Sequence, residues 1–127
     1  MKAIPRDLVD LEESLFDQPA VPLTEIKTTR YEEYAYGGVY LIYDGDELVK
    51  VGKTVWKEGH KERGLADRVD GLSSQNDSPL RRYYTNEQAN KCTVKAIEVV
   101  DPVLRGRLEY YLIGKYAPKV NHDELRY

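Results

Sequence analysis

The residues best suited to chemistry in this chain are a tyrosine and two lysines that stand beside glycines within residues 37–54. Tyr40 follows two glycines, and ten residues later Lys50 and Lys53 flank Gly52. Lysine ammonium groups bind phosphate oxygens, and a tyrosine hydroxyl donates or accepts a proton. This combination favours a site for a phosphate ester over a purely structural hairpin.

The pattern around these residues predicts a β-hairpin. Residues 39–43 and 48–51 are rich in β-branched and aromatic side chains, and an Asp-Gly-Asp turn sequence separates them. Because side chains alternate along a strand, Lys50 and Gly52 would share one face of the second strand. We therefore expect Lys50, and with it Lys53, to lie near Tyr40.

Patterns elsewhere in the chain predict an α+β fold. Apolar spacing predicts a helix over residues 5–16, and the prolines after it predict an extended or irregular connection up to residue 36. The other predicted elements are a helix over residues 64–72, a short helix over residues 80–84, a strand over residues 92–100, and a helix from Asp101 to about Tyr116. This order favours a small antiparallel or mixed sheet covered by helices.

We divide the chain into an N-terminal helical arm, residues 1–36, and a domain over residues 37–127. A chain of 127 residues is long enough for one domain with its own core. The arm would pack on the domain or form a dimer contact, so a homodimer is one assembly to consider. No apolar run is long enough to cross a bilayer and no signal peptide is evident, so we expect a cytoplasmic protein without a membrane partner.

Charge is unevenly distributed along the chain. The net charge of −3 argues against a strongly basic nucleic-acid binder. However, residues 1–36 carry four basic against eight acidic side chains, whereas residues 50–82 carry eight basic against five acidic ones. A basic face around the hairpin and an ordinary solvated surface both fit this distribution. The single cysteine, Cys92, is expected to be an unreactive, partly buried thiol.

The two motifs of the hairpin resemble the paired motif of the GIY-YIG nuclease family. Gly-Val-Tyr at residues 38–40 matches the first motif, with valine in place of isoleucine. Lys-Val-Gly at residues 50–52 is similar to the second motif, but Lys50 replaces the tyrosine that the family usually has there. The resemblance implies a three-stranded antiparallel sheet flanked by helices, and an endonuclease that cleaves DNA with Mg²⁺ or Mn²⁺.

After the second motif, the family carries an arginine that contacts the scissile phosphate. The Leu-x-x-Arg pattern that ends at Arg68 matches it, and Arg63 is the second candidate. An arginine fork binds two phosphate oxygens at once and stays charged. A surface ion pair with a nearby aspartate is the alternative interpretation of Arg68. Many members also carry a histidine near the end of this helix, whereas His60 and His122 lie elsewhere in this chain.

The last predicted helix resembles the glutamate-bearing helix of the family. This resemblance implies that Glu109 is a metal ligand and that Asn121 orients the backbone or the phosphate end of the site. One carboxylate, together with water and substrate phosphate, is a usual way to hold Mg²⁺. Without the resemblance, Glu109 would be interpreted as the partner of Arg105 in an i, i+4 ion pair.

The reaction that the resemblance implies needs a base and a cluster of positive charge. Tyr40 would accept a proton from the attacking water, and Arg68 and the metal would stabilise the charged transition state. A tyrosine acts as a base near neutral pH only when nearby cations stabilise its phenolate form. Lys50 would supply such a charge, so we interpret it as a working variant of the motif.

Aromatic and basic side chains near the site would bind the nucleic acid. Such a mixture can stack bases and hold phosphates, although tyrosines at a helix end more often serve packing. The predicted substrate-binding residues are Lys53, Arg63, Arg81, Arg82 and Tyr83.

The sequence leaves two functions open. The first is a DNA endonuclease that is restriction-like or selective for a DNA structure or single strand, and Tyr40, Arg68, Glu109 and Asn121 favour it. The second is a catalytically inactive module that binds nucleic acid or protein. The replacement at Lys50 and the acidic N-terminal arm favour this alternative.

Overall fold

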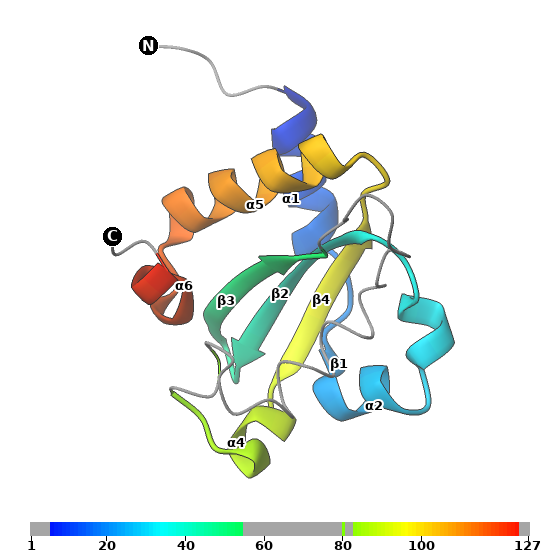
Figure 1. Ribbon diagram of the computed structural model, residues 1–127, viewed down its shortest axis with the longest axis vertical. Helices are drawn as coiled ribbons and strands as arrows, with labels where there is room; N and C mark the ends of the chain where they lie inside the picture. Colours follow the sequence, from blue (N-terminus) through cyan, green and yellow to red (C-terminus); the bar gives the residue numbers. More distant parts are fainter. Residues whose placement is uncertain (1–5, 55–79, 81–82, 125–127) are drawn as a thin grey trace, which may run out of the picture.

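The computed structural model describes residues 6–54, 80 and 83–124, which are built around one antiparallel sheet (Figure 1). The sheet contains four strands in the order β1-β4-β2-β3. Every neighbouring pair is antiparallel, and β1 and β3 form the two edges. The strands are β1 (Val21–Pro22), β2 (Gly38–Asp44), β3 (Glu47–Lys53) and β4 (Thr93–Glu98).

Helices cover both faces of the sheet. On the first face, here called the α5 face, α1 (Arg6–Phe16) and α5 (Pro102–Tyr116) pack in one apolar cluster with β2 and β3. The opposite face, the α2 face, contributes to a second cluster with α2 (Leu23–Lys27), α4 (Asn86–Asn90) and α6 (Lys119–Glu124). A 3₁₀ helix, η1 (Tyr31–Tyr34), connects α2 to β2.

The predicted α+β fold is confirmed, but the sheet has four strands rather than three. The additional strand is β1, in which Val21 pairs with Val94. The sequence predicts an extended or irregular connection over residues 17–36 but no defined strand there, because a two-residue strand beside prolines is too short to show an alternating pattern. The same stretch also contains α2 and η1, so that part of the prediction was wrong.

Apolar spacing predicts α1, and residues that favour the start of a helix predict α5. The predicted helix over residues 5–16 is confirmed as α1. At the start of α5 the Asp101 carboxylate accepts a hydrogen bond of 3.0 Å from the Val103 N–H, and Pro102 occupies the first turn. At its end, Ala117 adopts a left-handed conformation with φ of 43°.

Two further short helices were also missing from the prediction. One is α4, where Thr85 and Gln88 form a reciprocal capping box whose Thr-x-x-Gln pattern is visible in the sequence. The other is α6, which lies in a polar stretch that shows no apolar periodicity. The predicted helix over residues 64–72 and residues 81–82 of the predicted helix over residues 80–84 lie outside the described residues.

Cys92 is buried beside α4. Its thiol donates a weak hydrogen bond of 3.8 Å to the Gln88 carbonyl oxygen, and burial raises its pKa. Because a thiol reacts as the thiolate, a buried thiol with a raised pKa is inert. The predicted burial of this thiol is confirmed, and its low reactivity stays a prediction.

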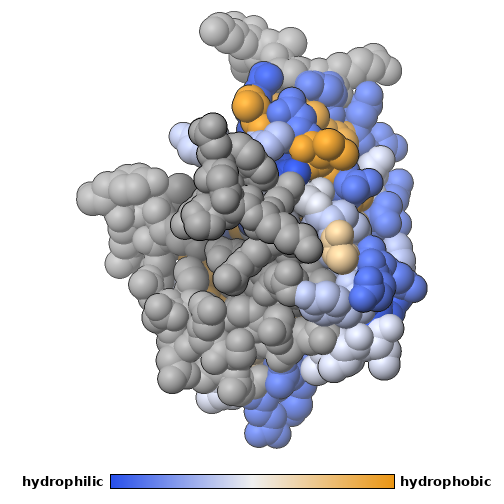
Figure 2. Space-filling view, turned by 45° about the vertical axis from the view of Figure 1, so that its right-hand side comes forward, coloured by the Kyte–Doolittle hydropathy of each residue, from blue (hydrophilic) through white to orange (hydrophobic). Residues whose placement is uncertain are grey.

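The surface of the described part is mostly polar. In the view of Figure 2 hydrophilic residues dominate the coloured area, and hydrophobic residues gather toward the upper end. Val100, Val103 and Tyr110 are the most exposed large hydrophobic residues. None of the helices in residues 6–54 and 83–124 is long and apolar enough to cross a membrane.

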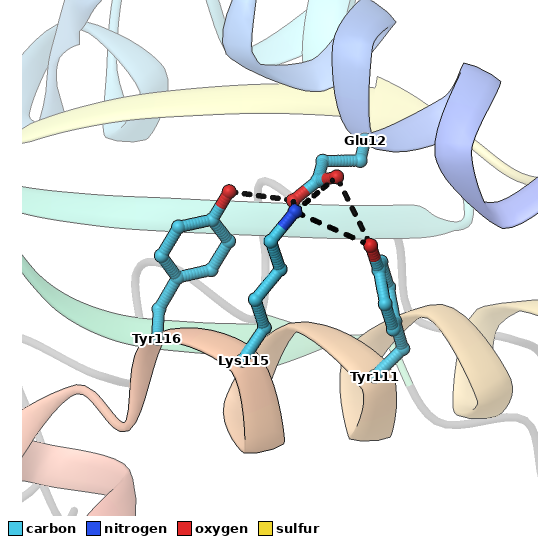
Figure 3. A network of polar contacts seen from close by, with 4 residues as sticks. All are labelled: Glu12, Tyr111, Lys115 and Tyr116. Carbon is cyan, nitrogen blue, oxygen red and sulfur yellow. Dashed lines mark hydrogen bonds and ion pairs between the residues drawn. The ribbon is translucent and has the colours of Figure 1, made fainter. Parts of the chain in front are cut away.

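A buried carboxylate joins the N-terminal helix to α5 (Figure 3). Glu12 of α1 accepts hydrogen bonds from the Tyr111 hydroxyl at 3.1 Å, the Lys115 ammonium at 2.9 Å and the Tyr116 hydroxyl at 2.6 Å. Burial alone would raise the pKa of Glu12, but the bonds from Tyr116, Lys115 and Tyr111 outweigh it and lower the pKa. These contacts fix how α1 lies against α5.

We expect Glu12→Gln to lower the free energy of unfolding by about 1–2 kcal/mol at neutral pH, because the amide replaces a charged acceptor by a neutral one. The pKa of Glu12 is lowered in the folded state, so its contribution is complete above the ordinary value of 4.5 and is lost as the pH falls through the folded value. Urea unfolding at pH 7 and pH 3 checks this. Glu13→Gln, at an exposed neighbouring position, is the control, and an equal effect of both changes would contradict the prediction.

Candidate active site

Tyr40 lies across Gly52 at the open end of the hairpin. The two residues are directly paired between β2 and β3. A Cβ atom built at position 52 would overlap the ring and the hydroxyl oxygen of Tyr40, whose side chain is fully buried. The phenol therefore reaches from β2 over the backbone of the edge strand β3, and only glycine at position 52 leaves room for it.

Lys50 lies on the same face of the hairpin as Tyr40. It pairs with Ile42, which is two residues beyond Tyr40 on β2, and side chains two apart on a strand share a face. Diagonal neighbours of this kind have their Cβ atoms about 7–8 Å apart or somewhat less, within reach of long side chains. Lys50 is only 2% exposed. The register thus brings the tyrosine and the lysine of the two motifs onto one buried surface.

Lys53 lies on the other face. It pairs with Val39, and Val39 belongs to the apolar cluster of the α5 face. Lys53 is half-buried. The strand register therefore separates Lys53 from Tyr40 and places it on the face that α5 covers.

Asn121 holds the edge of the hairpin. Its amide nitrogen donates to the Val51 carbonyl oxygen at 2.8 Å, and its amide oxygen accepts from the Val51 N–H at 2.6 Å. Val51 stands between Lys50 and Gly52 in the second motif, so the fully buried Asn121 fixes the backbone of this motif. An edge strand would otherwise leave these polar groups unpaired.

Glu109 belongs to α5 and is half-buried. Its neighbours Leu108, Leu112 and Ile113 pack into the cluster of the α5 face, whereas Tyr40 belongs to the cluster of the α2 face. Residues 6–54, 80 and 83–124 contain no group of three or more His, Cys, Asp or Glu that could form a closed metal site. A single carboxylate at Glu109 fits Mg²⁺, which keeps several waters and is completed by substrate phosphates.

Tyr83 lies at the turn end of the hairpin. Its neighbour Tyr84 donates a hydrogen bond of 3.0 Å to Asp44, the last residue of β2. The Lys119 ammonium lies 5.8 Å from the Tyr83 ring centroid and 4.9 Å from that of Tyr84. Asp44 is four residues from Tyr40, about 13 Å along the strand. Tyr83 is 40% exposed but is thus removed from the open end of the hairpin.

Four predicted site residues, all arginines, are not placed. They lie outside the described residues, and their roles stay predictions. They are Arg63, Arg68, Arg81 and Arg82.

Sequence analysis gave no site role to Arg105 and Thr54, which lie at the open end of the hairpin. Both are 2% exposed. A guanidinium nitrogen of Arg105 donates to the Thr54 hydroxyl oxygen at 3.1 Å. The sequence shows only an arginine four residues before Glu109, which is typical of a surface ion pair. No local pattern indicates that this side chain is buried against the hairpin.

The hairpin with its buried tyrosine and the long glutamate-bearing helix have the fold of a GIY-YIG nuclease domain. Among solved structures, the chain is similar to the GIY-YIG N-terminal endonuclease domain of UvrC from Thermotoga maritima bound to magnesium. The identity is 18%, the TM-score is 0.50, and the match covers 93% of this chain and 99% of that chain.

A point mutant of the same domain, bound to its catalytic divalent cation, also has a TM-score of 0.50 at 18% identity, with 93% and 98% of the two chains covered. No family model and no curated protein matches the chain. The fold predicted from the resemblance is therefore confirmed by structural similarity at low sequence identity.

We expect Gly52→Ala to lower the free energy of unfolding by about 1–3 kcal/mol, because the new methyl group would displace the buried Tyr40 ring. Gly114→Ala is the matched control. A Cβ atom there meets nothing within 4 Å, so alanine should stabilise α5 by about 0.5–1 kcal/mol. Urea unfolding of both variants measures the difference. A Gly52→Ala variant as stable as the wild type would contradict the placement of Tyr40.

Proposed function

We propose that this protein is a metal-dependent endonuclease that hydrolyses phosphodiester bonds of DNA. The observation that carries the proposal is the packing of Tyr40 over Gly52, with Lys50 on the same buried face, in a fold shared with GIY-YIG endonuclease domains. A hairpin needs neither a buried lysine nor a phenol over a glycine for its stability. Burying these polar groups costs free energy, and a reactive role would explain why they are buried.

Tyr40 is proposed as the group that takes a proton from the attacking water. As the water oxygen bonds to phosphorus, its proton passes to the phenolate oxygen, and the bond from phosphorus to the leaving oxygen breaks. The ammonium of Lys50 would stabilise the phenolate from the same face of the hairpin. Arg68 is proposed to bind the phosphate oxygens, and a proton from solvent would neutralise the leaving oxygen.

Glu109 is proposed to hold the divalent cation, Mg²⁺ or Mn²⁺. When bound, such an ion stabilises the negative charge that develops on the phosphate oxygens. Asn121 would act by fixing the backbone between Lys50 and Gly52, as its two bonds to Val51 indicate.

Lys53, Arg63, Arg81, Arg82 and Tyr83 remain proposed contacts for the nucleic acid. The position of Tyr83 at the turn end of the hairpin would place it on a more distant part of a bound strand. A cytoplasmic location also remains a proposal from the sequence. No observation on the described residues supports the homodimer.

The proposal is tested by incubating the protein with plasmid and single-stranded DNA in Mg²⁺ or Mn²⁺. We expect cleavage, and we expect Glu109→Gln to reduce it about 100-fold or more, because the cation loses its charged ligand. Glu87→Gln is the control, since Glu87 is an exposed carboxylate on α4. Cleavage by the Glu109 variant at the wild-type rate would overturn the assignment of the ligand.

A second prediction concerns the lysine that replaces the motif tyrosine. We expect Lys50→Ala to reduce cleavage about 10-fold to 1000-fold and to move the rising limb of the rate–pH profile to higher pH, because the phenolate loses a stabilising cation. Lys91→Ala, at an exposed position after α4, is the control. An unchanged rate and profile for Lys50→Ala would remove Lys50 from the mechanism.

The alternative function is a catalytically inactive binding module. The replacement of the motif tyrosine by Lys50 is the observation that favours it. A wild-type protein that binds DNA in a gel-shift assay but cleaves no substrate with either metal would establish this alternative instead.

A further inference from the structure

Arg105 joins the start of α5 to the end of β4 and to the hairpin. Its guanidinium donates hydrogen bonds to the Val99 carbonyl oxygen, to the Val100 carbonyl oxygen at 2.9 Å and to the Thr54 hydroxyl oxygen at 3.1 Å. The planar guanidinium presents its donors in a fixed fork, so three acceptors in three directions hold it in one orientation. The first turn of α5 is therefore fixed relative to Thr54.

Thr54 closes the open end of the hairpin. Its backbone N–H donates to the Gly38 carbonyl oxygen at 3.0 Å, and its hydroxyl oxygen accepts from the Gly38 N–H at 3.1 Å. Gly38 is two residues before Tyr40, and Thr54 is two residues after Gly52. The Thr54 hydroxyl is thus bonded both to the strand that carries Tyr40 and to the helix that carries Glu109.

The geometry connects the two halves of the proposed site. Glu109 lies one helical turn after Arg105, about 6 Å along the axis of α5. A helix is stiff over one turn, so a contact that fixes Arg105 also fixes where the Glu109 backbone stands relative to the hairpin. Arg105 and Thr54 are both buried, and their hydrogen bond links α5 directly to the open end of the hairpin.

We propose that Arg105 and Thr54 are positioning residues for the cleavage reaction, in that they set the spacing between the glutamate-bearing helix and Tyr40. This inference rests on the proposed nuclease function. Neither side chain touches the substrate in this scheme. Their effect is to hold the helix that carries the metal ligand at a fixed position against the hairpin, where a displacement of about 1 Å can reduce the rate about 100-fold.

The test compares Thr54→Val, which removes the hydroxyl but keeps the shape, with Thr54→Ser, which keeps the hydroxyl. For Thr54→Val we expect faster amide hydrogen exchange at Gly38, a kcat for DNA cleavage lower by about 10-fold to 100-fold, and a KM for DNA within about twofold of wild type. The apparent affinity for Mn²⁺, measured by electron paramagnetic resonance, should also fall. Thr54→Ser should restore all of these values to near those of the wild type.

Thr93→Val is the matched control, because Thr93 is a strand threonine at the opposite end of the sheet, paired with Tyr43. This variant should leave cleavage, exchange at Gly38 and Mn²⁺ affinity unchanged. If Thr54→Val does not fold, Arg105→Lys provides the same test, since lysine keeps the charge but lacks the planar fork.

The outcomes separate the two proposals. An active wild type whose Thr54→Val variant keeps its kcat and Mn²⁺ affinity, while exchange at Gly38 is faster, overturns the positioning role alone. A failure of Thr54→Ser to restore kcat also overturns it. A wild type that cleaves no substrate overturns the nuclease function, and with it this role.

Discussion

The phenol ring of Tyr40 occupies the space that a side chain at position 52 would need, and the proposed site is built on this overlap. The pairing of Tyr40 with Gly52 sets the register of the hairpin, and this register places Lys50 beside Tyr40 on the α2 face and Lys53 on the α5 face. A shift of the pairing between β2 and β3 by one residue would exchange the faces on which Lys50 and Lys53 lie. One steric condition therefore decides which basic side chain can assist the tyrosine.

Two polar contacts from distant parts of the chain hold the hairpin, and a third holds α1 against α5. Asn121 forms hydrogen bonds with the backbone of Val51 at the edge strand, and Arg105 donates one to Thr54 at the open end. Glu12 accepts a hydrogen bond from Tyr116 and so connects α1 to the C-terminal half of α5. All three groups are buried, so each contact is strong only if its geometry is maintained. The result is a rigid frame in which α5 cannot slide along the sheet.

Strong local signals account for the elements that the sequence predicted correctly. The Asp-Gly turn fixes the hairpin and the Asp-Pro start fixes α5, because each acts through neighbouring residues. The capping box of α4 is a local signal too, but the two-residue β1 and the short helices α2 and α6 have none. Their structure depends on packing against β4 and β3, which residues next to them in sequence do not reveal.

The sequence by itself determined the fold class, the hairpin and the α5 helix, along with candidate groups such as Tyr40 and Lys50, because residue type and local spacing are enough for these. Glu109 became a candidate only through the resemblance to the GIY-YIG family. Only the tertiary structure decided that Lys53 faces away from Tyr40, that Asn121 binds Val51 and that Arg105 is buried against Thr54. The physical reason is that strand register and helix docking bring together residues 70 positions apart, as in Val51 and Asn121, or 104 apart, as in Glu12 and Tyr116, and no local pattern encodes those contacts.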